Sequence, residues 1–129
     1  LNSINLNISL ESLKKEKENE VVIIDSFGKM DQYFNISDVV IFGGSFINKG
    51  GHNPIEAARY KCVIITGNKI FNWKNIYKDM HDEKACIILD EPGDTVNIIN
   101  KLIDDKDYMN ELKLNALKFS NKIFFKEKE

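Results

Sequence analysis

The sequence predicts an α/β fold in which a parallel sheet carries helices on both of its faces. Four short apolar runs rich in β-branched residues have the composition of buried strands, at residues 21–25, 39–42, 62–66 and 86–89. Because these runs are apolar without interruption, the strands are expected to be covered on both faces. Segments with helical spacing separate the runs, and this alternation is typical of βαβ units.

The remaining elements follow from the spacing of apolar residues along the chain. Residues 1–9 alternate weakly and predict a short extended piece, and residues 10–20 predict an exposed helix that ends in a run of lysine and glutamate. Helical spacing predicts further helices over residues 28–34, 53–60, 71–80, 95–103 and 106 to about 125. The expected architecture is about four parallel strands with helices on both faces of the sheet.

Length and composition favour one globular domain over residues 1–129. The chain has 129 residues, of which 43% are hydrophobic and 29% charged, and its formal net charge is −2. With that charge balance we expect no nucleic-acid partner. Because Arg59 is the only arginine, lysines and backbone amides would have to hold any anionic ligand.

The cysteines and the N-terminal sequence favour a reduced, cytoplasmic protein. Cys62 and Cys86 each lie inside an apolar run, and no signal peptide or membrane span is visible. The two cysteines with His52 and His81 lack the spacing of a zinc site, so no metal is expected.

The segment at residues 39–67, VVIFGGSFINKGGHNPIEAARYKCVIITG, carries the main functional signal. In it an apolar strand ends in Gly43-Gly44-Ser45, a second glycine pair follows at Gly50-Gly51, and a helix begins near Asn53. In parallel α/β sheets, ligands bind where strands end and helices begin, and glycines let a phosphate approach the backbone. The segment therefore predicts a site for an anion or a nucleotide.

Each of these residues also has a purely structural interpretation. Asn53 can cap the helix, with Pro54 as its first residue and Glu56 completing a capping box. Glu56 can instead accept hydrogen bonds from ribose hydroxyls, and the glycines can simply form turns. In the earlier segment DSFGKM, at residues 25–30, Asp25 or Ser26 can cap a helix that starts near Gly28.

Three common enzyme motifs are absent. GGSFI is not the GxSxG sequence of a nucleophilic serine, so Ser45 is not expected to attack a substrate. The loop lacks the Gly-Lys-Ser/Thr ending of an ATP-binding P-loop and the GxGxxG of a nicotinamide-cofactor site.

Three collinear motifs together resemble one known family. DSFGKM, ISDVVIFGGSFINKGGHNPIEAA and GNKIFNWKNI are similar to the C-terminal domain of the lipid A Kdo (3-deoxy-D-manno-octulosonic acid) transferases, over residues 21–76 with a weaker match to residue 125. The resemblance implies a glycosyltransferase of the two-Rossmann-domain (GT-B) type. Its C-terminal domain would hold the donor CMP-Kdo and would need neither a metal nor another cofactor.

The resemblance also implies which residues bind the donor. Glu56 would bind the ribose, Gly44 and Ser45 would line the phosphate or sugar, and Gly28 would lie beside the nucleotide. The full expected set is Gly28, Gly44, Ser45, Gly51, His52, Asn53, Glu56 and Asn72, with Phe71 beside the last. No catalytic residue is expected in this chain.

The sequence departs from the family pattern at three positions. Lys29 replaces an acidic residue, Lys49 stands where arginine is usual, and Val63 replaces a usual proline. The exchange at Lys49 keeps the charge but loses the bidentate fork of a guanidinium.

The resemblance covers only part of such an enzyme and implies that the chain is a partial Rossmann-like domain. The catalytic carboxylate, the membrane contact and the site for the lipid A precursor belong to an N-terminal domain, and the first strands of the C-terminal domain are also expected to be missing. The chain alone is therefore expected to be inactive, and a separately encoded N-terminal half is an expected partner. The full enzyme is expected to lie at the cytoplasmic face of the inner membrane. Two alternatives stay open: a non-catalytic remnant or association module with an open sheet edge, and a related transferase that uses another nucleotide sugar.

Overall fold

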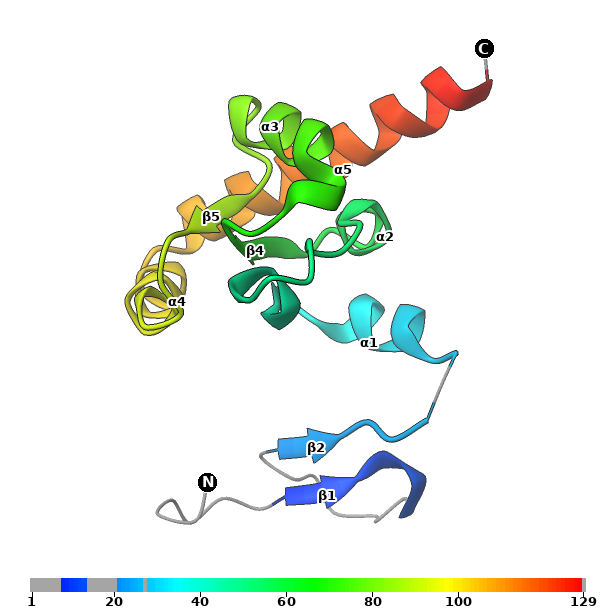
Figure 1. Ribbon diagram of the computed structural model, residues 1–129, viewed down its shortest axis with the longest axis vertical. Coiled ribbons are helices and arrows are strands. Elements are labelled where there is room, and N and C mark those ends of the chain that lie inside the picture. Colours follow the sequence, from blue (N-terminus) through cyan, green and yellow to red (C-terminus); the bar gives the residue numbers. More distant parts are fainter. Residues whose placement is uncertain (1–7, 14–20, 27, 129) are drawn as a thin grey trace. The chain divides into compact units, whose positions relative to one another are not determined.

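The computed structural model describes residues 8–13, 21–26 and 28–128, and its chain divides into two compact units, Leu1–Met30 and Asp31–Glu129 (Figure 1). Each unit is described by itself. The expectation of a single domain over residues 1–129 stays a prediction.

The first unit contains two short parallel strands. Strand β1 (Ile8–Leu10) pairs with β2 (Val21–Ile23) in a register that places Ile8 opposite Val21, and a 3₁₀ turn, η1 (Glu11–Leu13), follows β1. The predicted strand at residues 21–25 is therefore confirmed in its first three residues. The predicted helix over residues 10–20 is a single 3₁₀ turn where it is described, and residues 14–20 lie outside the described part.

Polar side chains tie η1 to the segment after β2. The backbone N–H and the hydroxyl of Ser12 donate to the Asp25 carboxylate, at 3.0 and 2.5 Å. The hydroxyl of Ser26 donates to Glu11, and the ammonium of Lys29 lies 2.7 Å from the same carboxylate. The lysine that departs from the family pattern thus has an acidic partner within its own unit.

These contacts correct the prediction of a helix cap in DSFGKM. Helix α1 (Met30–Ile36) begins two residues after Gly28, which adopts a φ of +81°. Asp25 and Ser26 are engaged with η1 instead, so neither caps the helix. The hydrogen bonds from Ser12 hold the pKa of the Asp25 carboxyl below its ordinary value, because they stabilise the ionised form.

The second unit is built on a three-stranded parallel sheet in the order β3-β4-β5. The strands are β3 (Val39–Phe42), β4 (Val63–Gly67) and β5 (Ile87–Leu89), and each lies within one residue of its predicted position at both ends. All five residues of the central strand are buried. This agrees with the uninterrupted apolar sequence, because a strand that is covered on both faces of the sheet buries all of its side chains.

Helices lie between the strands and after the last of them, close to the predicted ranges. They are α1, α2 (Ile55–Arg59), α3 (Lys74–Asp82), α4 (Asp94–Asp104) and α5 (Lys106–Lys128), with 3₁₀ turns η2 (Gly43–Phe46) and η3 (Phe71–Trp73). The helix predicted over residues 71–80 is η3 followed directly by α3.

Alternate residues of β4 point to opposite sides of the sheet and enter two hydrophobic clusters. Ile64 packs with Tyr77 and Met80 of α3, while Val63 packs with Leu102 of α4. Figure 1 accordingly shows α3 and α4 on opposite sides of β5. Each aliphatic side chain buried in this way contributes about 1.5–3 kcal/mol. The predicted α/β class with helices on both faces is confirmed.

Helix α5 takes part in both clusters. Leu112, near its start, packs on the side of α4, whereas Ala116 and Phe119 pack on the side of α2 and α3. Helix α5 therefore packs into the hydrophobic clusters on both faces of the sheet.

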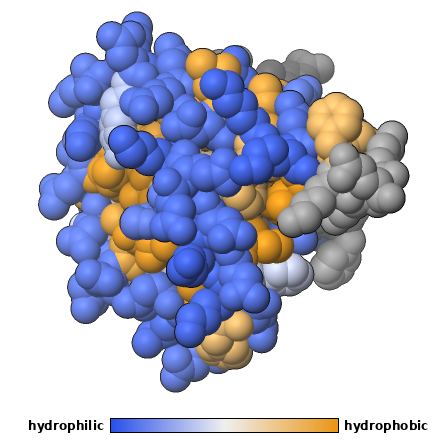
Figure 2. Space-filling model, turned by 90° about the horizontal axis from the view of Figure 1, so that it is seen from above, coloured by the Kyte–Doolittle hydropathy of each residue, from blue (hydrophilic) through white to orange (hydrophobic). Residues whose placement is uncertain are grey.

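The surface in the view of Figure 2 is mostly hydrophilic, with hydrophobic side chains gathered in several separate places among the charged ones. Among the described helices, none combines the length and the apolar character that a membrane span requires.

Candidate functional site

The carboxyl ends of the three parallel strands meet at one edge of the sheet of the second unit, and the predicted motif lies there. After β3 comes a segment that we call the glycine loop, residues 43–53, which leads into α2. After β4 comes the segment at residues 68–72, and Asp90 follows β5, where its carboxylate accepts a hydrogen bond from Asn68 at 3.3 Å. In a parallel sheet this edge is where ligands bind.

Ser45 fastens the start of the glycine loop to the sheet. Its side chain is fully buried, and its hydroxyl donates to the carbonyl oxygen of Phe42 while accepting the N–H of Gly67 at 2.6 Å. A methyl group at Gly67 would lie 2.5 Å from the Ser45 carbonyl oxygen. The close packing of the Gly67 backbone against the Ser45 backbone therefore requires glycine. The serine hydroxyl is therefore engaged with the backbone, and its predicted contact with a donor stays a prediction.

His52 lies over the first glycine pair. Its ring stacks on Phe42 with 5.7 Å between ring centroids, and a methyl group at Gly44 would lie 2.8 Å from its Nε2. The backbone of His52 is held as well, because the hydroxyl of Tyr77 donates to its carbonyl oxygen at 2.7 Å. Burial raises the pKa of Tyr77 far above its ordinary value, so the phenol stays protonated as the donor.

The second glycine pair packs against the segment after β4. Gly50 and Gly51 have φ of +87° and +81°, a backbone region that favours glycine. A methyl group at Gly50 would overlap the side chain of Asn72. The backbone N–H of Asn72 donates to the Gly50 carbonyl at 3.1 Å. The Asn72 amide also donates to the Lys49 carbonyl at 3.3 Å. The interpretation of the glycines as simple turn formers is therefore incomplete, since close packing requires them too.

Asn53 and Glu56 lie at the start of α2. The side-chain oxygen of Asn53 accepts the N–H of Ile55 at 3.0 Å, which is the hydrogen bond expected of the predicted cap. The helix itself begins at Ile55, one residue later than predicted, so Pro54 stands at the cap position. The second half of the predicted capping box is wrong: within the described part of the chain, the Glu56 carboxylate makes no hydrogen bond or ion pair, and it is exposed. Its oxygens are thus available to an external donor.

The structure brings seven of the eight predicted residues to one neighbourhood. Six belong to the glycine loop and α2, and Asn72 packs on that loop. Gly28 belongs to the first unit, and its role beside a nucleotide stays a prediction. Tyr77 was missed by the sequence analysis, because a tyrosine in a helical pattern is indistinguishable from an ordinary core residue.

A groove of about 520 Å³ adjoins the glycine loop. It lies between α3 and the segment after β4, and three lysines line it: Lys69, Lys74 and Lys78. Sequence analysis missed this groove as well, although Lys74, Lys78 and His81 recur at the spacing of one helical face.

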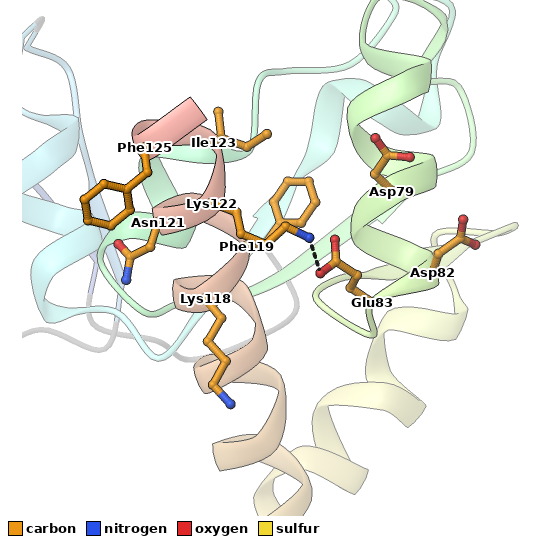
Figure 3. Close-up of a pocket in the computed structure, with 9 residues that line it drawn as sticks. All are labelled: Asp79, Asp82, Glu83, Lys118, Phe119, Asn121, Lys122, Ile123 and Phe125. Carbon is orange, nitrogen blue, oxygen red and sulfur yellow. Dashed lines mark hydrogen bonds and ion pairs between the residues drawn. The ribbon is translucent and has the colours of Figure 1, made fainter. Parts of the chain in front are cut away.

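A larger hollow, of about 780 Å³, lies between α3 and α5 (Figure 3). Its lining mixes acidic side chains at the end of α3 with lysines of α5, and Lys122 lies 2.7 Å from Glu83. Because the end of α3 leads to the amino end of β5, this hollow is at the opposite edge of the sheet. None of the predicted site residues lines it.

The cysteines are buried, and nothing in the described ranges points to a metal site. Cys62 and Cys86 are free thiols, and burial raises the pKa of Cys86 to about 12. No group of three or more histidine, cysteine or acidic side chains is placed to hold a metal ion within residues 8–13, 21–26 and 28–128.

Comparison with known proteins identifies relatives of this chain. No protein-family model matches the sequence. The chain is 30% identical over 116 residues to the 3-deoxy-D-manno-octulosonic acid transferase of Haemophilus influenzae, covering 78% of this chain and 27% of that protein. It is 35% identical over 103 residues to the enzyme of the same name from Rickettsia bellii, covering 78% and 24%. The chain therefore spans about a quarter of the length of these relatives.

A solved structure extends the likeness to the fold. The C-terminal CMP-Kdo binding domain of WaaA from Acinetobacter baumannii superposes with a TM-score of 0.83 at 25% identity, covering 92% of this chain and 63% of that one. Sequence and structure thus confirm the resemblance, and the chain is related to the C-terminal domain of the Kdo transferases.

Proposed function

We propose that the chain is the donor-binding part of a Kdo transferase and that the glycine loop, the start of α2 and Asn72 hold CMP-Kdo. The observation that carries the proposal is the superposition on a CMP-Kdo binding domain, together with the position of the GGSFINKGGHNPIE motif at the carboxyl edge of the sheet. Ligands of parallel α/β sheets bind at this edge.

The proposed roles follow from the available atoms. Glu56 is exposed without a protein partner, and a carboxylate can accept two hydrogen bonds from the neighbouring hydroxyls of a ribose. The phosphate of the donor would lie against the glycine loop, where Gly44 lets it approach the backbone. Amide donors there would stabilise the charge that develops on the phosphate as CMP leaves.

The buried and loop residues would act mainly by holding the site in shape. Ser45 fixes the loop to β4, Asn53 caps α2, and Asn72 supports Gly50 from the neighbouring segment. His52, stacked on Phe42, would form one wall beside the donor. A site held in advance loses less entropy when its ligand binds.

The complete reaction requires more than this chain. We propose that an N-terminal domain supplies the catalytic carboxylate and the site for the lipid A precursor, and that the assembled enzyme works at the cytoplasmic face of the inner membrane without metal or cofactor. The relatives favour this function over a transferase for another nucleotide sugar. A remnant that keeps the fold but has lost the nucleotide site is the remaining alternative.

Calorimetric titration of the purified chain with CMP, UMP and AMP tests the proposal. We expect CMP to bind more tightly than UMP and AMP. Tighter binding of UMP or AMP than of CMP would support a transferase for another nucleotide sugar, and no binding by a folded chain would support the remnant.

A further inference from the structure

The groove between α3 and the segment after β4 is lined mostly by residues outside the proposed nucleotide site. Lys69 comes from the segment after β4, and Lys74, Lys78 and His81 come from one face of α3. Asn48 of the glycine loop also lines it, so the groove opens beside the proposed donor site. Its volume of about 520 Å³ lies within the range of ordinary ligand pockets.

The charge of the groove is positive. Asp82 is the one acidic residue among its lining side chains, and its carboxylate lies 3.9 Å from the ammonium of Lys78. Lys69 and Lys74 have no ion pair with any described residue. Because the whole chain carries a formal charge of −2, this excess is a local feature.

The groove also has an apolar side. Ile70, Phe71 and Ile88 line it, and the side chain of Phe71 is 63% exposed. An aromatic ring that exposed gains from contact with an apolar part of a ligand. Lysines beside apolar surface would suit a ligand that carries both a phosphate and an apolar portion.

We propose that this groove binds the phosphate group of a second ligand, a phosphorylated molecule with an apolar portion, beside the nucleotide. Lys69 and Lys74 would contact the phosphate as point charges, and Phe71 would cover the adjoining apolar part. That the ligand lies next to the donor rests on the proposed function, whereas phosphate binding in the groove does not.

The test uses the full chain labelled with ¹⁵N and two probes. Glucose 6-phosphate supplies a soluble phosphomonoester, with glucose as its control. Phosphatidylcholine vesicles that contain phosphatidic acid supply a phosphomonoester on a lipid, with pure phosphatidylcholine vesicles as their control. We expect the phosphorylated probe to shift the amide signals of Lys69, Phe71 and Lys74. The shifts should be the same whether or not saturating CMP is present.

A charge-matched pair of double variants separates the groove from general electrostatic attraction. The variant Lys69→Gln/Lys74→Gln should bind the probe about tenfold more weakly, because two charge-assisted contacts are lost. The variant Lys106→Gln/Lys118→Gln removes the same charge from exposed positions of α5 and should change affinity less than about twofold.

Each outcome decides the proposal. Binding of glucose 6-phosphate that depends on Lys69 and Lys74 supports a soluble source of the phosphate, and binding of the vesicles alone with the same dependence supports a lipid. Absence of binding by both probes, equal weakening by both double variants, or displacement of the probe by CMP would overturn a second site. If the probe binds in the groove but CMP binds nowhere, the proposed function fails and the groove stands.

Discussion

The hydroxyl of Ser45 accepts the backbone N–H of Gly67 across 2.6 Å, and so ties the turn after β3 to the last residue of β4. The same hydroxyl donates to the carbonyl of Phe42. One buried side chain thus sets the relative position of two strand ends, where the glycine loop and the next segment begin.

Replacing Ser45 by alanine should destabilise the second unit and weaken nucleotide binding. Gly67 and Phe42 would each lose a hydrogen-bond partner in a buried place, which costs about 1–3 kcal/mol. Urea unfolding followed by circular dichroism measures the loss. The control is Ser120→Ala, since Ser120 is equally buried but donates only to Leu117 within its own helix. Equal losses in the two variants would contradict the role of Ser45.

Gly50→Ala should destabilise the glycine loop. Its φ of +87° costs an alanine about 1–2 kcal/mol, and the methyl group would also overlap Asn72. Gly93→Ala is the matched control, because Gly93 has a φ of −63° and open space around it. That change should stabilise the protein by about 0.4–1 kcal/mol. If urea unfolding shows the same effect for both variants, the packing argument is wrong.

Glu56→Ala should affect ligand binding without affecting stability. We expect the affinity for CMP to fall by about 1–3 kcal/mol, because the ribose hydroxyls lose their acceptor. The free energy of unfolding should change by less than about 0.5 kcal/mol, since the carboxylate is exposed and has no partner among the described residues. Calorimetry with CMP and urea unfolding measure the two quantities. The control is Glu111→Ala, at an exposed glutamate of α5, which should change neither the CMP affinity nor the free energy of unfolding. Unaltered CMP affinity in Glu56→Ala would remove Glu56 from the site.

Stability should fall in alkaline solution. Burial raises the pKa of Cys86 from 9.0 to about 12, so between these two values the unfolded chain loses a proton that the folded chain keeps. The stabilisation is complete below pH 9 and is lost progressively as the pH rises to about 12, and the raised pKa of Tyr77 acts in the same direction. Urea midpoints measured at pH 8 and pH 10.5 check this.

The matched variant for the alkaline experiment is Cys86→Ala. It should show a smaller difference between the two pH values, although its stability at pH 8 is lower because of the lost packing. An equal difference in the variant would show that Cys86 does not cause the alkaline loss.

The strands and the helix order could be predicted from sequence because their signals are local. Residues 39–42 and 62–66 are apolar runs without interruption, and the structure places β3 and β4 there within one residue. Val63, which replaces a usual proline of the family, is the first residue of β4. Its N–H donates to the carbonyl of Asp38 at 2.8 Å, a bond that proline could not make.

The errors arose where distant contacts override local preference. Asp25 and Ser26 have the composition of helix caps, but Ser12 and Glu11, more than ten residues earlier, engage them. Glu56 is a different case, because it stands at the position of a capping-box residue but its carboxylate has no partner among the described residues.

The motif of the site could be predicted from sequence, but the contacts that hold it in place could not. The glycine loop follows from sequence, because two glycine pairs flank one loop between an apolar run and the start of a helix. The contacts from Tyr77 to His52 and from Asn72 to Gly50 join segments that are more than twenty residues apart, and no local pattern encodes them. The lysine groove likewise depends on α3 lying beside the segment after β4.

The measurement that tests the central claim most directly is a ¹⁵N NMR titration of the chain with CMP. The account predicts saturable shifts concentrated at Gly44, Asn53 and Glu56, with the amides of α5 beyond Ala116 unchanged. Shifts that are absent from these residues in a folded chain, or that gather in the hollow between α3 and α5, would contradict it.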